Sequence, residues 1–565
     1  MRSARPSETG TKIELFLSRG DAGPALAGGL DVSALATAVE GDTPARGPLV
    51  HSNVDAGGDP NSLRDQGWGV IAPAGEAGDR LLALARPLIE RRAADQDAEV
   101  PVYRVPPDMT AARAAAWIDR KLVENALNST IPGYLLVLGR PDQVSFELQQ
   151  VLGGSFSVGR VGFDADAGYE AYIDKLLRAQ RAPAASPRAV YFTARDGSPA
   201  TELGRRLLMQ PCIADAEQQR GAGRFAAEIT AVEDDDPARA ADRLVEAAAG
   251  PGVVFSCSHG AGAPAGGWGS PERRRALQGA LDLGRGRRLE VEALAAARFA
   301  PGGVWVMFAC FGAGTPARSA YHHWLARLAA AGEHDGDLAQ VLASLPAEGE
   351  PPFLAALPQA ALASPDGPLA VIGHLDLAWS YGFCDVDKLS RGERHRRFHE
   401  LVAQLVKGTR VGLALGGSLM RARNQVQLEI SIADDDAAAA GGEPQLQLGH
   451  RWMVMQDLAG YIALGDPAAR LAIPVQAGPR AEPAAAPAPA PAAEVRTATA
   501  APAAALTAEA IQTAVHDLLA GRVTLDELAV RHGVTAAAVA EWRRVYTDAG
   551  LRAVAALAAA ASSTR

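Results

Sequence analysis

Val304-Trp305-Val306-Met307-Phe308-Ala309-Cys310-Phe311-Gly312-Ala313-Gly314 is an apolar run that ends in a cysteine and a glycine-rich turn. An earlier run of the same kind, Val253-Val254-Phe255-Ser256-Cys257-Ser258-His259-Gly260, ends in a histidine and a glycine. Each run is too short for a helix and has the length of a strand buried on both faces. In an open parallel sheet the carboxyl ends of neighbouring strands border one crevice. The two runs therefore predict that Cys310 and His259 meet there, as a nucleophile and its partner.

The totals indicate a folded protein of several domains. The chain has 565 residues, of which 48% are hydrophobic and 21% are charged. Its net charge of −10 argues against a chain built around nucleic acid. The four cysteines lack CxxC spacing, which favours a reducing compartment over a disulfide scaffold. Because we find neither an apolar signal region nor a run of about 20 apolar residues, we expect a cytoplasmic protein without a membrane span.

Apolar runs alternate with helical patterns along most of the chain, and this order predicts parallel sheets with helices on both faces. Besides the two runs quoted above, strands are expected at 69–72, 100–105, 134–139, 189–193, 229–232 and 369–373, and the second α/β unit is expected to close with residues 461–467. Helices are expected at 79–92, 110–125, 144–151, 201–209, 237–248, 317–331 and 396–406. The predicted fold class is α/β, with two successive parallel-sheet α/β/α units and a small all-α helix-turn-helix domain.

The domain boundaries follow from changes in composition. Residues 1–66 are predicted to be an irregular N-terminal segment, 67–180 the first α/β subdomain and 181–476 the second, which holds the candidate catalytic residues. Residues 477–505 are almost all Ala and Pro, and such a segment forms a semi-rigid linker rather than a core. Residues 506–565 are the predicted helix-turn-helix module.

The candidate site motifs carry a family resemblance. Ala309-Cys310-Phe311-Gly312 has the Ala-Cys-x-Gly core of caspases, with a histidine about 50 residues upstream. The strand 134–139 and the ending Gly465-Asp466-Pro467 resemble segments of gingipains. Over about residues 66–475 the chain thus resembles the caspase-like (clan CD) cysteine peptidases, of gingipain-like and CHAT-like type. The resemblance implies a cysteine endopeptidase that cleaves protein substrates without a cofactor.

The chemistry of peptide cleavage gives each candidate residue a role. A free thiol is only a few per cent thiolate at neutral pH, so Cys310 needs activation. His259 can polarise that thiol or protonate the leaving amine. The tetrahedral intermediate needs fixed donors for its oxyanion, and the backbone N–H groups of Gly260 and Cys310 are the predicted ones. A glycine beside the histidine leaves room for the scissile carbonyl.

Residues after a later strand are candidates for the substrate pocket. Asp376 could bind a basic side chain of the substrate by charge-assisted hydrogen bonds, and Trp379 could form a pocket wall. The alternatives are a helix cap or a solvated loop carboxylate for Asp376 and core packing for Trp379. Cys257 would give only three metal ligands with His259 and Cys310, where structural zinc usually takes four. Core packing is therefore favoured for Cys257, and no metal is expected.

The C-terminal pattern predicts a helix-turn-helix unit that resembles those of transposase-like bacterial proteins. Its helices are expected at 506–519, 524–532 and 536–546, the second with a Thr524–Glu527 capping box. Arg543 and Arg544 are offset by Glu541, so docking to a partner protein is slightly favoured over DNA binding. The alternative function for the whole chain is a non-catalytic regulator or adaptor whose helix-turn-helix binds DNA or a partner protein.

Overall fold

The computed structural model describes residues 12–19, 23–38, 58–123, 131–181, 186–233, 236–332, 337–384, 394–440 and 445–473. It also describes Ile511, Ala514, Leu528, Arg531, His532, Val534, Val539 and Trp542. The described residues up to Ile473 belong to one compact unit, and those from Ile511 onward belong to a second.

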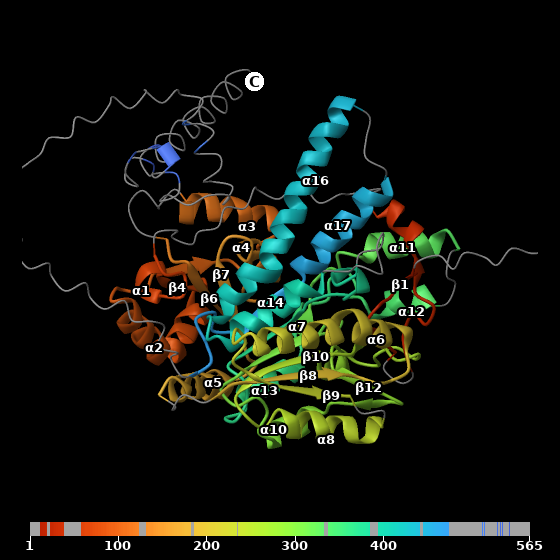
Figure 1. Ribbon diagram of the computed structural model, residues 1–565, viewed down its shortest axis with the longest axis horizontal. Coiled ribbons are helices and arrows are strands. Elements are labelled where there is room, and N and C mark those ends of the chain that lie inside the picture. Colours follow the sequence, from red (N-terminus) through yellow and green to blue (C-terminus); the bar gives the residue numbers. More distant parts are fainter. Residues whose placement is uncertain are drawn as a thin grey trace, which may run out of the picture. The chain divides into compact units, whose positions relative to one another are not determined.

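A ten-stranded sheet runs through the first unit (Figure 1), in the order β5-β4-β6-β7-β18-β17-β14-β10-β8-β9. Its strands are β4 (Trp68–Pro73), β5 (Val102–Val105), β6 (Tyr134–Leu138), β7 (Ser157–Val161), β8 (Arg188–Thr193), β9 (Glu228–Val232), β10 (Gly252–Cys257), β14 (Val304–Phe308), β17 (Ala370–His374) and β18 (Tyr461–Gly465). All neighbouring strands are parallel except β17 and β18. The predicted α/β class with two parallel sets is confirmed, and one antiparallel pair joins both sets into a continuous sheet.

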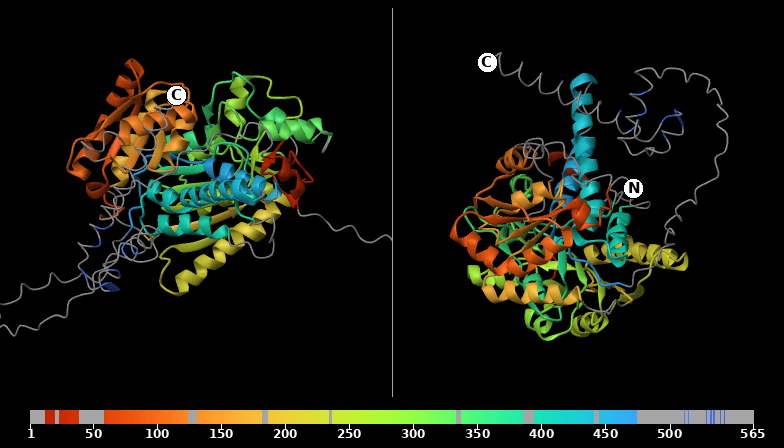
Figure 2. Two further views of the ribbon diagram at one scale, coloured as in Figure 1. Left: turned by 90° about the horizontal axis from the view of Figure 1, so that it is seen from above. Right: turned by 90° about the vertical axis from the view of Figure 1, so that its left-hand side faces the viewer.

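The first parallel set, β5-β4-β6-β7, is covered by helices on both faces (Figure 2). These are α2 (Glu76–Gln96), α3 (Ala111–Ile118), α4 (Phe146–Leu152) and α5 (Asp166–Ala179). Successive strand residues point to opposite faces. Leu135 and Val137 therefore join one apolar cluster, with residues of α3 and α4, while Leu136 joins the other, with residues of α2 and α5. This alternation explains why the strands are apolar along their whole length.

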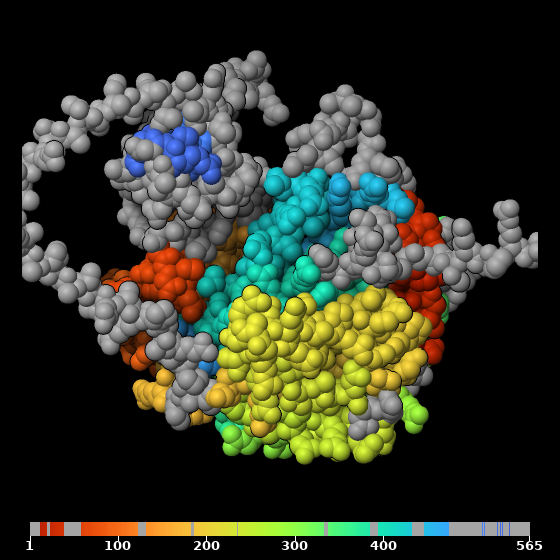
Figure 3. All heavy atoms as spheres, in the orientation of Figure 1, coloured from red at the N-terminus to blue at the C-terminus, as the bar shows by residue number. Residues whose placement is uncertain are grey.

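The second set packs aromatic side chains between its strands and helices. Helices α7 (Gln210–Gly221) and α14 (His395–Val406) lie together, and α14 contacts β8 and β10. Phe398 of α14 stacks on Phe255 of β10, with ring centres 5.9 Å apart. Residues coloured yellow to cyan, among them these helices, form most of the described surface in the space-filling view (Figure 3).

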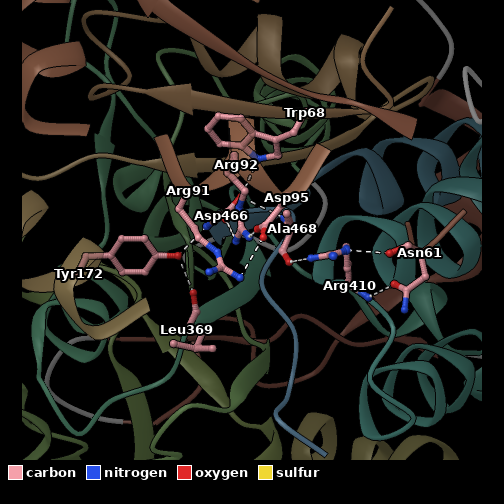
Figure 4. Close-up of polar contacts among 10 residues, drawn as sticks. All are labelled: Asn61, Trp68, Arg91, Arg92, Asp95, Tyr172, Leu369, Arg410, Asp466 and Ala468. Carbon is pink, nitrogen blue, oxygen red and sulfur yellow. Dashed lines mark hydrogen bonds and ion pairs between the residues drawn. The ribbon is translucent and has the colours of Figure 1, made fainter. Parts of the chain in front are cut away.

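A buried ion pair ties the first set to the end of β18 (Figure 4). Arg92 of α2 is 1% exposed and donates two hydrogen bonds to the carboxylate of Asp466, which is fully buried. The indole N–H of Trp68 and the backbone N–H of Ala468 also donate to Asp466, each at 3.0 Å. A buried carboxylate is tolerated when it is paired in this way. The Gly-Asp-Pro ending therefore has a structural role here.

The prediction that residues 1–66 are irregular is wrong for the short regular elements that this stretch contains. They are β1 (Lys12–Ile13), β2 (Leu17–Ser18), β3 (Leu30–Asp31), the 3-10 helix η1 (Val32–Thr37) and α1 (Leu63–Gln66). β2 lies at the edge of a second sheet of order β13-β12-β11-β2, beside β11 (His259–Ala261). The other strands of this sheet are β12 (Leu281–Gly284) and β13 (Arg287–Arg288). Two-residue strands are too short to show a period in the sequence. The pairing of β2 depends on β11, which lies in a distant part of the chain.

The linker 477–505 and most of the predicted helix-turn-helix, including Thr524 and Arg543, lie outside the described residues. Among those described in the second unit, Ala514, Leu528 and Val539 form a small apolar cluster. In the described part of the chain we find no helix that combines the length and the apolar character needed to cross a membrane.

Candidate active site

Cys310 and His259 lie at the same edge of the sheet. Cys310 follows β14 and His259 follows β10, and these neighbouring parallel strands end together, with Cys257 opposite Phe308. Gly260 packs so closely on the next strand end that a Cβ atom there would lie 1.8 Å from the carbonyl oxygen of Cys310. The structure thus brings the predicted residues together, and only glycine fits at position 260.

The two predicted oxyanion donors converge on one atom. The backbone N–H groups of Gly260 and Cys310 both donate to the carbonyl oxygen of Phe16, at 2.9 and 3.3 Å. Two backbone N–H groups that point at a single oxygen form the geometry of an oxyanion hole. Phe16 belongs to the N-terminal stretch, and sequence reasoning did not connect it with the site.

The turn after Cys310 is held in an uncommon conformation. Phe311 has a φ of 55°, in the left-handed region that bulky residues rarely adopt. Its N–H donates to the backbone carbonyl of Asp376 at 2.9 Å. Such strain persists only where the surroundings impose it, and it is frequent at active sites. Here it fixes the direction in which Cys310 leaves β14.

The thiol of Cys310 is enclosed by the segment after β17. Its Sγ accepts a hydrogen bond from the N–H of Ala378 at 3.1 Å and donates to the carbonyl of the same residue at 3.6 Å. The side chain is fully buried. Burial raises the pKa of the Cys310 thiol well above its ordinary value, and the Ala378 N–H opposes this only in part. In this arrangement the thiol is therefore protonated at neutral pH.

The imidazole of His259 is oriented by residues that follow β8. Its Nε2 lies 2.8 Å from the hydroxyl of Ser198 and 3.5 Å from a carboxylate oxygen of Asp196. Nδ1 has no hydrogen-bond partner within the described ranges. Burial lowers the pKa of His259, while the negative charges of Asp196 and Asp282 oppose that shift. The ring is therefore neutral near pH 7. Its Nε2 contacts Ser198 and Asp196, and its Nδ1 has no such partner in the described part of the chain.

Sequence reasoning missed Asp196 and Ser198. Their position could have indicated this role, because both follow the strand 189–193. In a parallel sheet the carboxyl end of that strand lies beside the carboxyl end of the histidine strand.

The predicted pocket residue Asp376 uses its carboxylate within the protein. Its oxygens accept hydrogen bonds from the Ser319 hydroxyl and from the N–H groups of Ala320 and Leu377, each at 2.8 Å. Burial raises the pKa of Asp376 to about 6, and these hydrogen bonds oppose the rise. These contacts join the loop after Cys310 to the loop after β17. Asp376 is 6% exposed, so its carboxylate is a buried structural group and not the solvated carboxylate of the alternative interpretation.

The backbone of Trp379 lies beside the site, whereas its side chain points into the core. It pairs with Leu15 in an isolated antiparallel bridge. Its buried ring packs on Trp324 and Tyr381, with ring centres 5.6 and 5.9 Å away. These are core contacts, as in the alternative that the sequence left open.

Cys257 is fully buried, and its Sγ would lie 2.7 Å from a Cβ atom on Gly204. Across the described ranges, no group of three His, Cys, Asp or Glu side chains is arranged to hold a metal ion.

Comparison with known proteins gives structural matches alone. No protein-family model and no curated protein matches the chain. A solved structure described as a protease aligns with a TM-score of 0.43 and 14% identity, over 72% of this chain and 78% of its own. The Arg-specific cysteine proteinase gingipain R aligns with a TM-score of 0.40 and 13% identity, over 72% and 78%. The complex of the Porphyromonas gingivalis RgpB pro- and mature domains aligns with a TM-score of 0.39 and 12% identity, over 72% and 79%.

Proposed function

We propose that this protein is a cysteine endopeptidase in which Cys310 is the nucleophile and His259 its acid–base partner. The observation that carries the proposal is the convergence of the Gly260 and Cys310 N–H groups on one carbonyl oxygen, beside a thiol and an imidazole. In peptide hydrolysis these donors would stabilise the oxyanion that forms when the thiolate attacks the scissile carbonyl.

The surroundings of His259 fit the second half of this role. Ser198 and Asp196 hold Nε2, which leaves Nδ1 free to take the thiol proton and to pass it to the leaving amine. The nearby carboxylate stabilises the imidazolium that exists between these two transfers, as the third member of a catalytic triad does. Asp196 and Ser198 are therefore positioning residues for His259.

We further propose that the enzyme works in the cytoplasm and is recruited or regulated through its C-terminal module. All four cysteines are free thiols, as expected in a reducing compartment. The apolar cluster of Ala514, Leu528 and Val539 supports a small packed helical unit that could dock on a partner protein or on DNA.

A peptide-library assay tests the proposed activity. Because Phe16 covers the dyad, the test protein carries Phe16→Asp, since a carboxylate is not stable in an apolar pocket and the segment should leave the cleft. We expect cleavage by this chain and none after addition of Cys310→Ala. Addition of Cys212→Ala, which removes another buried thiol, should leave cleavage unchanged. If the chain with Cys310 intact cleaves no peptide, or if Cys310→Ala cleaves equally well, the proposal is wrong.

A further inference from the structure

Residues 14–16 of the N-terminal stretch run antiparallel to the segment after β17. Phe16 N–H donates to the carbonyl of Ala378 at 3.0 Å, and Ser380 N–H donates to the carbonyl of Glu14 at 2.9 Å. Glu14 N–H also donates to the hydroxyl of Ser380 at 2.9 Å. These bonds flank the bridge between Leu15 and Trp379. An extended chain paired in this way is bound as a peptide is bound by β-augmentation.

Beyond Phe16 the chain changes its pairing partner. Leu17 and Ser18 form β2, which pairs in parallel with Gly260 and Ala261 of the histidine segment. Gly262 N–H donates to the carbonyl of Ser18 at 2.8 Å. The peptide bond between Phe16 and Leu17 is therefore held on both sides, and its carbonyl oxygen lies on the two oxyanion donors.

The side chain of Phe16 fills an apolar pocket. Its ring centre lies 4.8 Å from that of Phe308, edge to face, and 5.8 Å from that of Phe383. The imidazole of His259 is 5.9 Å away. A Cβ atom on Gly204 would lie 3.2 Å from the tip of the ring, so this glycine forms the end of the pocket. The neighbours described for the ring are thus two phenyl rings, an imidazole and a glycine backbone.

We propose that the segment Ile13–Ser18 is the enzyme's own substrate: Phe16 occupies the specificity pocket, and the Phe16–Leu17 bond is the bond that the enzyme cuts in its own chain. This inference rests on the proposed peptidase function. It adds a substrate class, peptides with an aromatic residue before the cut, and a modification site.

The reaction balances with water as the only co-reactant. The Cys310 thiol gives its proton to His259, and the sulfur attacks the Phe16 carbonyl carbon. The C–N bond to Leu17 then breaks, and the amine leaves with the proton from His259. Water hydrolyses the thioester, which releases the Phe16 carboxylate and restores the thiol. Each group is supplied by the site as described, and the tether provides the high effective concentration of an intramolecular substrate.

The same arrangement explains why both members of the dyad are inaccessible. Cys310 and His259 have no exposed surface, and Phe16 contacts the backbone of one and the ring of the other. An external peptide that uses the same N–H donors has to displace this segment. The first substrate of each molecule is therefore its own chain.

Mass analysis of the purified protein during incubation tests the cut. We expect a new chain that begins at Leu17, formed at a rate independent of protein concentration, and no such product from Cys310→Ala or Phe16→Asp. Leu35→Ala, which removes another fully buried side chain of the N-terminal stretch, should be cut as the wild type is. A cut at this bond in Cys310→Ala, or an intact bond in the wild type, would overturn the inference.

Fluorogenic peptides separate this inference from the proposed function. The Phe16→Asp chain is given Ile-Glu-Leu-Xaa-aminomethylcoumarin with Phe, Arg or Asp at the last position. We expect kcat/KM for Phe to exceed the other two by at least about 100-fold, because the pocket would leave a charge unpaired. Faster cleavage after Arg or Asp would overturn the inference and leave the peptidase intact. Cleavage of none of the three, nor of any library peptide, would overturn both.

Discussion

Replacing Asp196 by Asn tests whether His259 works as an acid–base group. The carboxylate lies 3.5 Å from Nε2 and is 8% exposed. At that distance two unit charges interact by about 5 kcal/mol when the effective dielectric constant is about 20. The Asn side chain keeps the shape and loses the charge, so the imidazolium formed during the reaction loses most of this stabilisation. We expect kcat/KM to fall by about 100- to 10,000-fold, the contribution typical of a positioned acid–base group.

The pH profile supplies a second readout with a definite sign. Burial lowers the pKa of His259 and Asp196 raises it, so removal of Asp196 lowers that pKa further. Activity is lost on the acid side as the imidazole becomes protonated and can no longer accept the thiol proton. The acid limb of kcat/KM should therefore move to lower pH in Asp196→Asn, while the plateau falls.

Ser198→Ala is the matched control, because it removes a hydrogen bond to the same nitrogen and leaves the charge in place. We expect a loss of about tenfold, from one hydrogen bond of about 1 kcal/mol and looser positioning, with the acid limb nearly unmoved. Both variants are measured in the Phe16→Asp background with the Phe peptide. A plateau in Asp196→Asn within about threefold of its parent, with an unchanged acid limb, would refute the assignment of His259.

Three further results are expected. Gly260→Ala should abolish peptide cleavage, because its Cβ would meet the Cys310 carbonyl at 1.8 Å and push one oxyanion donor away; retention of more than about a tenth of kcat/KM would contradict this. Gly204→Ala should shorten the end of the Phe16 pocket, because its Cβ would meet the ring at 3.2 Å, and should lower the ratio of kcat/KM for the Phe peptide to that for an Ala peptide by at least about tenfold. Burial raises the pKa of Asp457 to about 8, so the folded state holds a proton that the unfolded chain releases above about pH 4. The free energy of unfolding therefore falls as pH rises from about 4 to about 8, by up to about 1.4 kcal/mol per pH unit. Asp457→Asn should make the urea-unfolding midpoint less dependent on pH over this range.

The parts of the fold that could be predicted are those with a local signal. Buried parallel strands are short, continuous apolar runs, and both β10 and β14 have this pattern. Strand β7 (Ser157–Val161) was missed because Arg160 stands within it. That arginine is fully buried and donates to Gln149, to the Gly139 carbonyl and to the Ser145 carbonyl. Its partners come from other segments, so no local pattern distinguishes it from a surface arginine.

The candidate site was predictable to the same extent. Cys310, His259 and Gly260 follow apolar runs, and their meeting follows from strand order alone. The position of Phe16 depends on pairing between the N-terminal stretch and segments more than 200 residues later. No pattern in the sequence indicates which residues pair across that separation.

The proposed oxyanion donors hold the Phe16 carbonyl at 2.9 and 3.3 Å, and the longer bond is the one from Cys310, the proposed nucleophile. Donors that bind a ground-state carbonyl loosely and an oxyanion tightly lower the barrier, whereas equal binding of both would not. The segment is therefore kept in place mainly by its strand pairing and by the burial of the Phe16 ring. Once the Phe16–Leu17 bond is cut, the covalent link between these contacts and the rest of the chain is gone. If this cut occurs, a ligand at fixed high effective concentration becomes a peptide with an ordinary dissociation constant, held by non-covalent contacts that include the pairing of β1 with β3.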